Sequence, residues 1–240
     1  VSLIYKRPLT NSWLDQAKAL TEALAPHYKV KFIGRSRKQK LMVTNDYVTE
    51  QFELDGQQLK YQQVEGSFTQ PNGEVNRKML GWAKAVSQQL SGDLLELYCG
   101  NGNFSIALAP CFGQVVATEI SRTSIKSAQY NITLNNVTNL QVLQMPAEDV
   151  SAALQDGSKL KQLDLKDMQL DTVLVDPPRA GLDDGTVELV SRFNDILYIS
   201  CNPDTLAQNL QALMQSHYIV KLAVFDQFPY TDHIESGAIL

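Results

Sequence analysis

The segment from Asp93 to Glu119, DLLELYCGNGNFSIALAPCFGQVVATE, decides the fold that we predict for this chain. Residues 94–98 form an apolar run short enough for a buried strand, and a glycine-bearing loop follows at 99–103. Residues 104–108 indicate the start of a helix, and residues 115–118 indicate a second strand that ends at the acidic residue Glu119. Glycine lets a loop turn sharply and lets a ligand approach its backbone, while an acid at the next strand tip can accept both hydroxyls of a ribose. The segment therefore predicts a pocket for a nucleoside cofactor.

The identity of that cofactor depends on how the loop compares with known fingerprints. The dinucleotide-binding pattern G-x-G-x-x-G/A requires glycine or alanine at the position that Ser105 occupies. S-adenosylmethionine has no pyrophosphate, so it does not need a helix N-terminus that is bare of side chains. The loop and its acid therefore fit S-adenosylmethionine at least as well as NAD, and an ordinary strand-to-helix turn is the remaining interpretation.

Length and composition limit the classes of protein to which the chain can belong. Its 240 residues, of which 44% are hydrophobic, can bury one substantial core with a smaller appended piece. No apolar run is long enough to span a membrane, and the net charge of −5 argues against a generally basic nucleic-acid coat. Because the chain begins with Val1, we expect it to be a fragment of a longer protein.

The cysteines and histidines predict neither a disulfide framework nor a metal site. The three histidines form no ligand cluster, and the three cysteines lie far apart without a C-x-x-C pair: Cys99, Cys111 and Cys201. This usage is typical of a reducing cytoplasm, so we expect a cytoplasmic protein without metal.

Residues 1–65 predict a small, partial α+β module. Helical spacing runs over 13–25, and the Asp55-Gly56 pair between two strand-like runs indicates a hairpin. The segment Lys29–Lys40, KVKFIGRSRKQK, is rich in basic residues. It is either a solvated hairpin in an otherwise acidic protein or a patch that contacts phosphates, since backbone contacts need only clustered positive charge.

Residues 66–240 predict one domain in which strands and helices alternate. A long amphipathic helix is expected at about 74–90, and Asn72 or Gly73 can cap it. From residue 94 onward the alternation is typical of βαβ units, and so predicts a parallel sheet covered by helices on both faces. Residues 157–169, which are polar and charged, indicate a surface insertion.

Chemistry-bearing residues follow several of the predicted strands. Asp176 begins the stiff turn Asp-Pro-Pro-Arg, whose prolines restrict the backbone and hold its carboxylate in one orientation. Cys201 precedes Asn202-Pro203 and a helix, whose N-terminus is expected to lower the thiol pKa and favour a nucleophilic thiolate. In such a sheet ligands bind beyond the carboxyl ends of the strands. Purely structural interpretations also remain open. The Asp-Pro-Pro-Arg segment can be only a rigid turn, and Cys201 can be only a buried side chain that packs as a small hydrophobic group.

Five motifs in order carry a resemblance: ELYCGNGNFS, ATEIS, VDPPRAG, ISCNP and HIESG. From about Phe68 to the end, the chain resembles the RNA uracil-C5 methyltransferases, and within them the bacterial tRNA branch. The resemblance implies a Rossmann-like class I S-adenosylmethionine-dependent methyltransferase fold. It also implies methylation at C5 of a uridine in the tRNA T-loop (m5U54, ribothymidine), with ribosomal RNA or tmRNA as alternative substrates and the T-arm of tRNA as partner of a monomeric protein.

The resemblance further implies the roles of individual residues. Cys201 would be the nucleophile that adds to C6 of uracil, and Glu235, which on its own would be taken as an exposed carboxylate, would be the proton acceptor. The implied S-adenosylmethionine site contains six residues: Gln70, Tyr98, Gly100, Asn103, Glu119 and Asp176. A small-molecule methyltransferase would need neither the thiol nor the basic segment, an NAD-dependent oxidoreductase would need the third glycine, and a catalytically silent RNA-binding module stays a further alternative.

Overall fold

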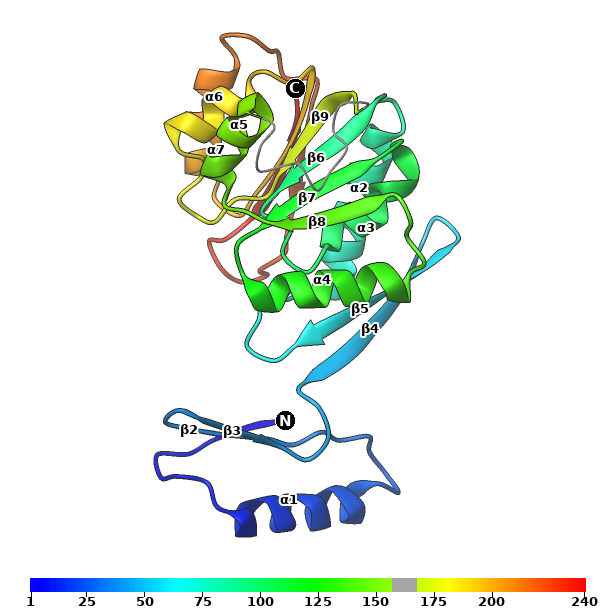
Figure 1. Cartoon of the computed structure of the whole chain (residues 1–240), viewed down its shortest axis with the longest axis vertical. Coiled ribbons are helices and arrows are strands. Elements are labelled where there is room, and N and C mark those ends of the chain that lie inside the picture. Colours follow the sequence, from blue (N-terminus) through cyan, green and yellow to red (C-terminus); the bar gives the residue numbers. More distant parts are fainter. Residues whose placement is uncertain (157–167) are drawn as a thin grey trace. The chain divides into compact units, whose positions relative to one another are not determined.

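The computed structural model of the chain describes residues 1–156 and 168–240 (Figure 1). The chain folds into two compact units, one formed by Val1–Val48 with Gln63–Gly66 and the other by Thr49–Gln62 with Ser67–Leu240. The hairpin residues Thr49–Gln62, which the sequence analysis assigned to the N-terminal module, therefore belong to the second unit. Most of the expected insertion at 157–169 lies outside the described residues.

The first unit combines a small sheet with one helix. Strand β1 (Ser2–Ile4) is parallel to β2 (Ile33–Ser36), which is antiparallel to β3 (Gln39–Met42), and helix α1 spans Asn11–Leu24. A side chain on Gly34 would place its Cβ 2.6 Å from the Trp13 ring, so glycine allows the helix to pack closely on β2. The basic segment thus forms the hairpin of β2 and β3, as one of its two interpretations predicted.

A second hairpin joins the core of the second unit. Strands β4 (Tyr47–Leu54) and β5 (Gln57–Val64) are connected through Asp55 and Gly56, whose φ values of 48° and 79° give the left-handed turn that such hairpins require. Helix α2 (Gly73–Ser87) follows, and the Asn72 side chain caps it by accepting a hydrogen bond from the Val75 N–H. The predicted hairpin and cap are both confirmed.

The second unit is built on a seven-stranded sheet with the order β11-β12-β10-β9-β6-β7-β8. Every strand pair is parallel except those that involve β12, which runs antiparallel to both β10 and β11. The predicted α/β fold is confirmed, but the prediction of a parallel sheet missed this one reversed strand. The seven strands are β6 (Asp93–Leu97), β7 (Val115–Glu119), β8 (Leu140–Gln144), β9 (Leu170–Val175), β10 (Asp195–Ser200), β11 (Lys221–Phe225) and β12 (Glu235–Ile239).

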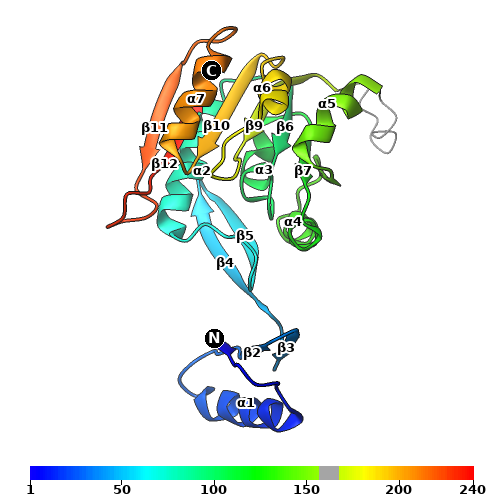
Figure 2. The same cartoon turned by 90° about the vertical axis from the view of Figure 1, so that its left-hand side faces the viewer.

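Helices cover both faces of this sheet, as Figure 2 shows. One face carries α2, α3 (Asn103–Leu108) and α4 (Arg122–Leu134), and a short 3-10 helix (Ala109–Cys111) continues α3. The other face carries α5 (Ala147–Asp156), α6 (Asp184–Val190) and α7 (Pro203–Leu213). The short helix α6 was not expected from the sequence.

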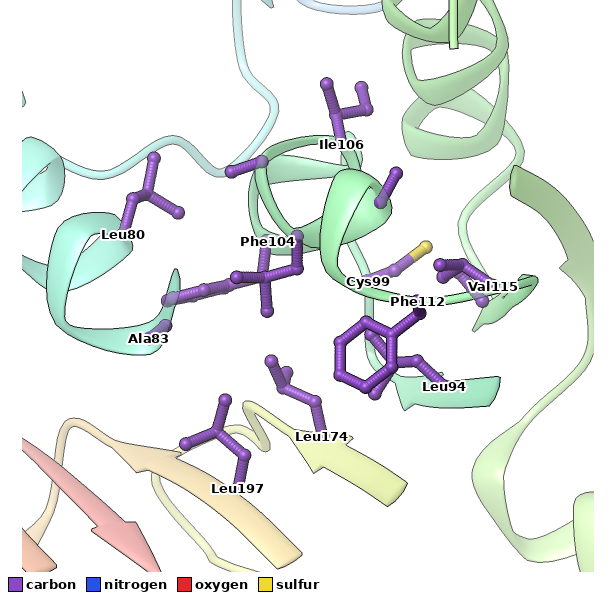
Figure 3. Close-up of a cluster of buried hydrophobic side chains, with 14 of the residues drawn as sticks. Leu80, Ala83, Leu94, Cys99, Phe104, Ile106, Phe112, Val115, Leu174 and Leu197 are labelled. Atoms are coloured by element: carbon purple, nitrogen blue, oxygen red, sulfur yellow. The ribbon is translucent and has the colours of Figure 1, made fainter. Parts of the chain in front are cut away.

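Each face of the sheet has its own apolar core, because neighbouring residues of a strand point to opposite sides. Leu94 of β6 lies in the core under α2 and α3, whereas Leu95 lies in the core under α5 to α7. Figure 3 shows the first core, where Phe104 of α3 sits between Leu80 of α2 and Leu174 of β9. These cores hold the strand ends in register, and so fix the positions of the loops that follow them.

Candidate cofactor and catalytic site

The loop after β6 has several residues with positive φ, and there is free space next to its backbone at Gly100. Gly100 and Gly102 have φ values of 57° and 83°, which glycine adopts without steric cost. Tyr98 also has a positive φ of 62°, a strained value for a residue with a side chain. A Cβ added to Gly100 would meet no atom within 4 Å, so a ligand can approach the backbone there. Free space of this kind is what the predicted cofactor loop requires.

Glu119, at the tip of β7, ties this loop to the next strand. Its Oε2 accepts the Gly100 N–H at 3.0 Å, and its Oε1 accepts the N–H groups of Ile120 and Ser121 at 2.9 and 2.7 Å. A carboxylate offers about four acceptor positions. One position on Oε2 therefore remains for a ligand hydroxyl, whereas the sequence analysis expected both ribose hydroxyls to bind.

Asn103 is held from two sides at the start of α3. Its side-chain amide and that of Asn76 on α2 form a reciprocal pair, with Nδ2···Oδ1 distances of 2.9 and 3.0 Å. Its backbone carbonyl accepts the hydroxyl of Tyr61, which lies buried in the β4–β5 hairpin, at 3.0 Å. The amide of Asn103 is thus engaged within the protein, and these contacts fix the helix that ends the loop.

Two further predicted cofactor residues lie in different surroundings. Tyr98 is half-buried, and burial raises the pKa of its phenol. Gln70, in the turn before α2, accepts a hydrogen bond at 2.7 Å from the amide of Gln227. Gln227 follows β11, so this contact joins segments 157 residues apart in the chain.

Asp176, Cys201 and Glu235 come together at one edge of the sheet. Asp176 directly follows β9, Cys201 directly follows the neighbouring β10, and Glu235 begins β12. Ser200 of β10 pairs with Ser236 of β12, and because β12 is reversed its amino end meets the carboxyl end of β10. The reversed strand therefore brings Glu235 beside the thiol.

Burial and mutual charge shape the protonation of these groups. Burial raises the pKa of Asp176 well above its usual range, and the charges of Glu235 and Glu96 add to this. Burial likewise raises the pKa of Glu235 to about 7. Only 3% of Glu235 is exposed, so the interpretation of this residue as an exposed carboxylate is wrong. Its Oε2 atom has no hydrogen-bond partner among the described residues.

The prediction that the helix N-terminus lowers the Cys201 pKa is wrong for the protein alone. The thiol is half-buried, and this burial raises its pKa above the ordinary value. The carboxylates of Glu235 and Asp176 raise it further, while Arg179 acts in the opposite direction. Negative charge from two distant segments thus outweighs the local effect on which the sequence argument was based.

Glu96 is a buried acid that the sequence analysis missed. It lies in the middle of β6, 1% exposed, and accepts a hydrogen bond from the Ser105 hydroxyl of α3. Burial raises its pKa to about 8. The signal that could have revealed it is an acid inside an otherwise apolar strand, at residues 94–97.

In the first unit, part of the basic segment is neutralised by neighbours. Arg35 Nε donates to Glu65 at 2.7 Å, and Lys40 Nζ lies 2.6 Å from Asp46. Lys31 donates to Asn45 and to the carbonyl of Tyr47. The exposed cations of the segment without an ion pair among the described residues are Lys29, Arg37 and Lys38. Only these three fit the role of phosphate contacts.

The described part of the chain holds neither a membrane-spanning helix nor a metal cluster. No helix there is both long and apolar enough to cross a bilayer. No group of three or more histidine, cysteine, aspartate or glutamate side chains there is placed to hold a metal ion.

Solved structures share the fold of this chain. A tRNA (uracil-54, C5)-methyltransferase from Pyrococcus abyssi, in complex with S-adenosyl-L-homocysteine, superposes with a TM-score of 0.72 at 24% identity, covering 100% of this chain and 55% of that one. A SAM-dependent methyltransferase from Agrobacterium tumefaciens gives a TM-score of 0.57 at 11% identity, covering 91% and 78%. The chain therefore has the fold of the S-adenosylmethionine-dependent methyltransferases.

Sequence relatives identify the family within that class. The profile of the tRNA (Uracil-5-)-methyltransferase family matches residues 1–240, and the chain belongs to this family. A tRNA/tmRNA (uracil-C(5))-methyltransferase of Shewanella amazonensis is 54% identical, and the match covers all of this chain and 67% of that protein. The corresponding protein of Aromatoleum aromaticum is 53% identical, and the match covers all of this chain and 65% of that protein. The chain thus spans about two thirds of these relatives. The predicted family is confirmed, and with it S-adenosylmethionine as the family's cofactor.

Proposed function

We propose that this chain transfers a methyl group from S-adenosylmethionine to C5 of a uridine in RNA, and that its target is U54 in the T-loop of tRNA. The observation that carries the proposal is the meeting of a thiol and a buried carboxyl, Cys201 and Glu235, at the edge of the sheet where the open glycine loop lies. The names of the 54% identical relative and of the Pyrococcus structure support the substrate. A uridine in tmRNA is the second candidate target, because the relatives' names include tmRNA.

The residues at this edge fit S-adenosylmethionine. The backbone at Gly100 is open to a ligand, and Glu119 keeps one acceptor position for a ribose hydroxyl. The charges of Glu235 and Glu96 raise the pKa of Asp176, and a cationic sulfonium bound there would favour the ionised carboxylate. Tyr98, Asn103 and Gln70 complete the proposed cofactor site.

The proposed reaction assigns one role to Cys201 and one to Glu235. The Cys201 thiol loses its proton to water, its thiolate sulfur adds to C6 of uracil, and the electron pair of the C5–C6 double bond moves towards C5 as an enolate. S-adenosylmethionine, when bound, supplies the electrophilic methyl group that C5 takes up. Glu235 then removes the C5 proton, the double bond re-forms, and the C6–S bond breaks to return the thiolate.

The raised pKa of Glu235 suits its role as a base, whereas that of Cys201 means that the thiol must be deprotonated before it reacts. In the free protein Cys201 keeps its proton at neutral pH, because burial and two carboxylates disfavour the thiolate. Glu235, with a pKa of about 7, is about half ionised at neutral pH, which is the range in which a general base works best. The target base must also leave the stack of its loop to reach the thiol. We further propose that the protein acts as a cytoplasmic monomer on the T-arm.

Mapping the methylated nucleotide tests this function. The protein, extended to the full length of its relatives, is incubated with labelled S-adenosylmethionine and a pool of tRNA, tmRNA and ribosomal RNA. We expect 5-methyluridine at position 54 of tRNA, and a second product in tmRNA if that RNA is also a substrate. Label found only in ribosomal RNA, or only in small molecules added as competitors, contradicts the proposal.

A further inference from the structure

The loop between β11 and β12 contains a buried amide whose role the proposed mechanism leaves unassigned. Gln227 is 2% exposed, and its Nε2 donates to Gln70 at 2.7 Å. Its Oε1 is buried and has no hydrogen-bond partner within the described residues. A buried polar atom without a partner costs free energy, so such an atom needs a reason to be kept.

The position of this amide places it at the catalytic edge. Phe225, the last residue of β11, pairs with Glu235, and the Gln227 N–H donates to the Phe225 carbonyl at 2.9 Å. Gln227 therefore lies at the same ends of adjacent strands as Glu235 and Cys201. Glu235 Oε2 is the other buried acceptor without a partner in this part of the described chain. Two unpartnered acceptors at one site indicate a ligand that brings a donor.

The unpartnered atom is Gln227 Oε1, and its chemistry determines which group of a ligand can bind to it. Because Gln70 engages the nitrogen of the Gln227 amide, the atom that remains is an oxygen, which accepts and does not donate. In a uridine the ribose occupies N1, so N3–H is the only N–H donor of the base. Cytosine carries a lone pair instead of a proton at N3, and would meet the oxygen with repulsion.

We propose that Gln227 reads the N3–H of the target uracil and so selects uracil over cytosine. This inference rests on the proposed function, because it needs the flipped base to enter at Cys201 and Glu235. N3 and C5 are both bonded to C4 of the ring, so an acceptor for N3–H and the base that takes the C5 proton lie on the same side of the uracil. Gln70 is then a positioning residue, which holds the Gln227 amide with its oxygen towards the base.

Methylation of T-arm hairpins tests the proposal, with uridine, cytidine or 3-methyluridine at the target position. The proteins, at the full length of the relatives, are wild type, Gln227→Met, Gln227→Ala and a control, Gln211→Ala, which alters an exposed glutamine of α7. Gln227→Met keeps the side-chain volume but not the acceptor, so kcat/KM on uridine hairpins should fall about 10- to 100-fold. The control should match wild type.

The 3-methyluridine hairpin separates recognition from folding. Wild type should bind it about 100-fold more weakly than the uridine hairpin, because the methyl group takes the place of the donated proton. Gln227→Ala removes the opposing side chain, so it should bind the 3-methyluridine hairpin more tightly than wild type does, and within about threefold of the uridine hairpin. A misfolded variant cannot show the gain over wild type. If Gln227→Ala keeps the full wild-type preference for uridine, or if Gln227→Met is as active as wild type, the inference is wrong. Wild type that methylates none of the hairpins contradicts the proposed function instead.

Discussion

Gly100 and Glu119 are joined by a 3.0 Å hydrogen bond from the backbone N–H of the loop to the carboxylate at the tip of the neighbouring strand. The same carboxylate accepts two more backbone N–H groups, from Ile120 and Ser121. Glu119 fixes the shape of the glycine loop, and in the proposed cofactor site it also offers an acceptor to the nucleoside. Removing it should affect both.

Glu119→Ala should weaken S-adenosylmethionine binding at least about tenfold, because a hydrogen bond to a charged group contributes about 1.5 to 3 kcal/mol. Calorimetric titration with S-adenosylmethionine measures this. Glu22→Ala, at an exposed position of α1, is the matched control and should bind as wild type does. Unchanged affinity of Glu119→Ala would remove this residue from the cofactor site.

The turn of the β2–β3 hairpin should contribute to RNA binding through Arg37 and Lys38. The double variant Arg37→Gln, Lys38→Asn keeps a residue that tolerates the positive φ of 60° at position 38. RNA affinity should fall, and the slope of log K against log salt should become shallower by about 0.7 to 0.9 for each phosphate that the variant no longer neutralises. The affinity for S-adenosylmethionine should stay the same.

Lys221→Gln, an exposed charge change at β11, controls for the change in net charge. An unaltered salt slope in the double variant would leave the hairpin as a solvated surface without a role in RNA binding. Arg35 and Lys40 are unsuitable for this test, because their ion pairs with Glu65 and Asp46 hold the first unit together.

Glu235→Gln should stabilise the protein at high pH. The folded protein raises the pKa of this carboxyl to about 7, from an ordinary value of 4.5. The favourable contribution of the protonated group is complete below the unfolded pKa, and is lost as the pH rises through 7. At pH 9 the variant should gain about 2 to 3 kcal/mol in the free energy of unfolding, and at about pH 4 almost nothing.

Urea unfolding at the two pH values measures this difference. Glu22→Gln should shift stability little at either pH, because that side chain is exposed. A Glu235→Gln variant that is no more stable than wild type at the higher pH would show that the carboxyl is not held at this raised pKa.

Much of this site could be predicted from the sequence, because its residues lie at the ends of the predicted strands. The parallel strands β6, β7, β9 and β10 end at one edge, so the glycine loop, Glu119, Asp176 and Cys201 were expected there, and the structure brings them to that edge. This works because each residue directly follows its own apolar run, and a short apolar run is readable without tertiary information.

What the sequence could not predict depends on contacts between distant segments. The thiol pKa was inferred from the adjacent helix, yet burial and the charges of Glu235 and Asp176 decide it. The burial of Glu235 arises from the reversed strand β12, and the short segment ESGAI, with three small residues, gives no clear strand signal. Gln227 gave no signal, because its importance lies in one atom that has no partner among the described residues.

In the proposed reaction, Cys201 forms a covalent bond to C6 of the target uracil. In T-arm RNA with 5-fluorouracil at the target position, the group on C5 after methyl transfer is fluorine, which Glu235 cannot remove as a cation. The cycle should therefore stop with protein and RNA joined. With ordinary uridine RNA, Glu235→Gln should accumulate the same kind of adduct, because addition and methyl transfer precede the step that it impairs.

The most direct measurement is a denaturing gel of labelled 5-fluorouracil RNA with S-adenosylmethionine and the protein at the full length of its relatives. Wild type should show a slower band of covalent complex that survives denaturation. Cys201→Ala should show no such band while it still binds S-adenosylmethionine in calorimetry, and Cys111→Ala, which alters a half-buried cysteine beyond α3, should behave as wild type. A covalent band of wild-type intensity with Cys201→Ala would show that Cys201 is not the nucleophile.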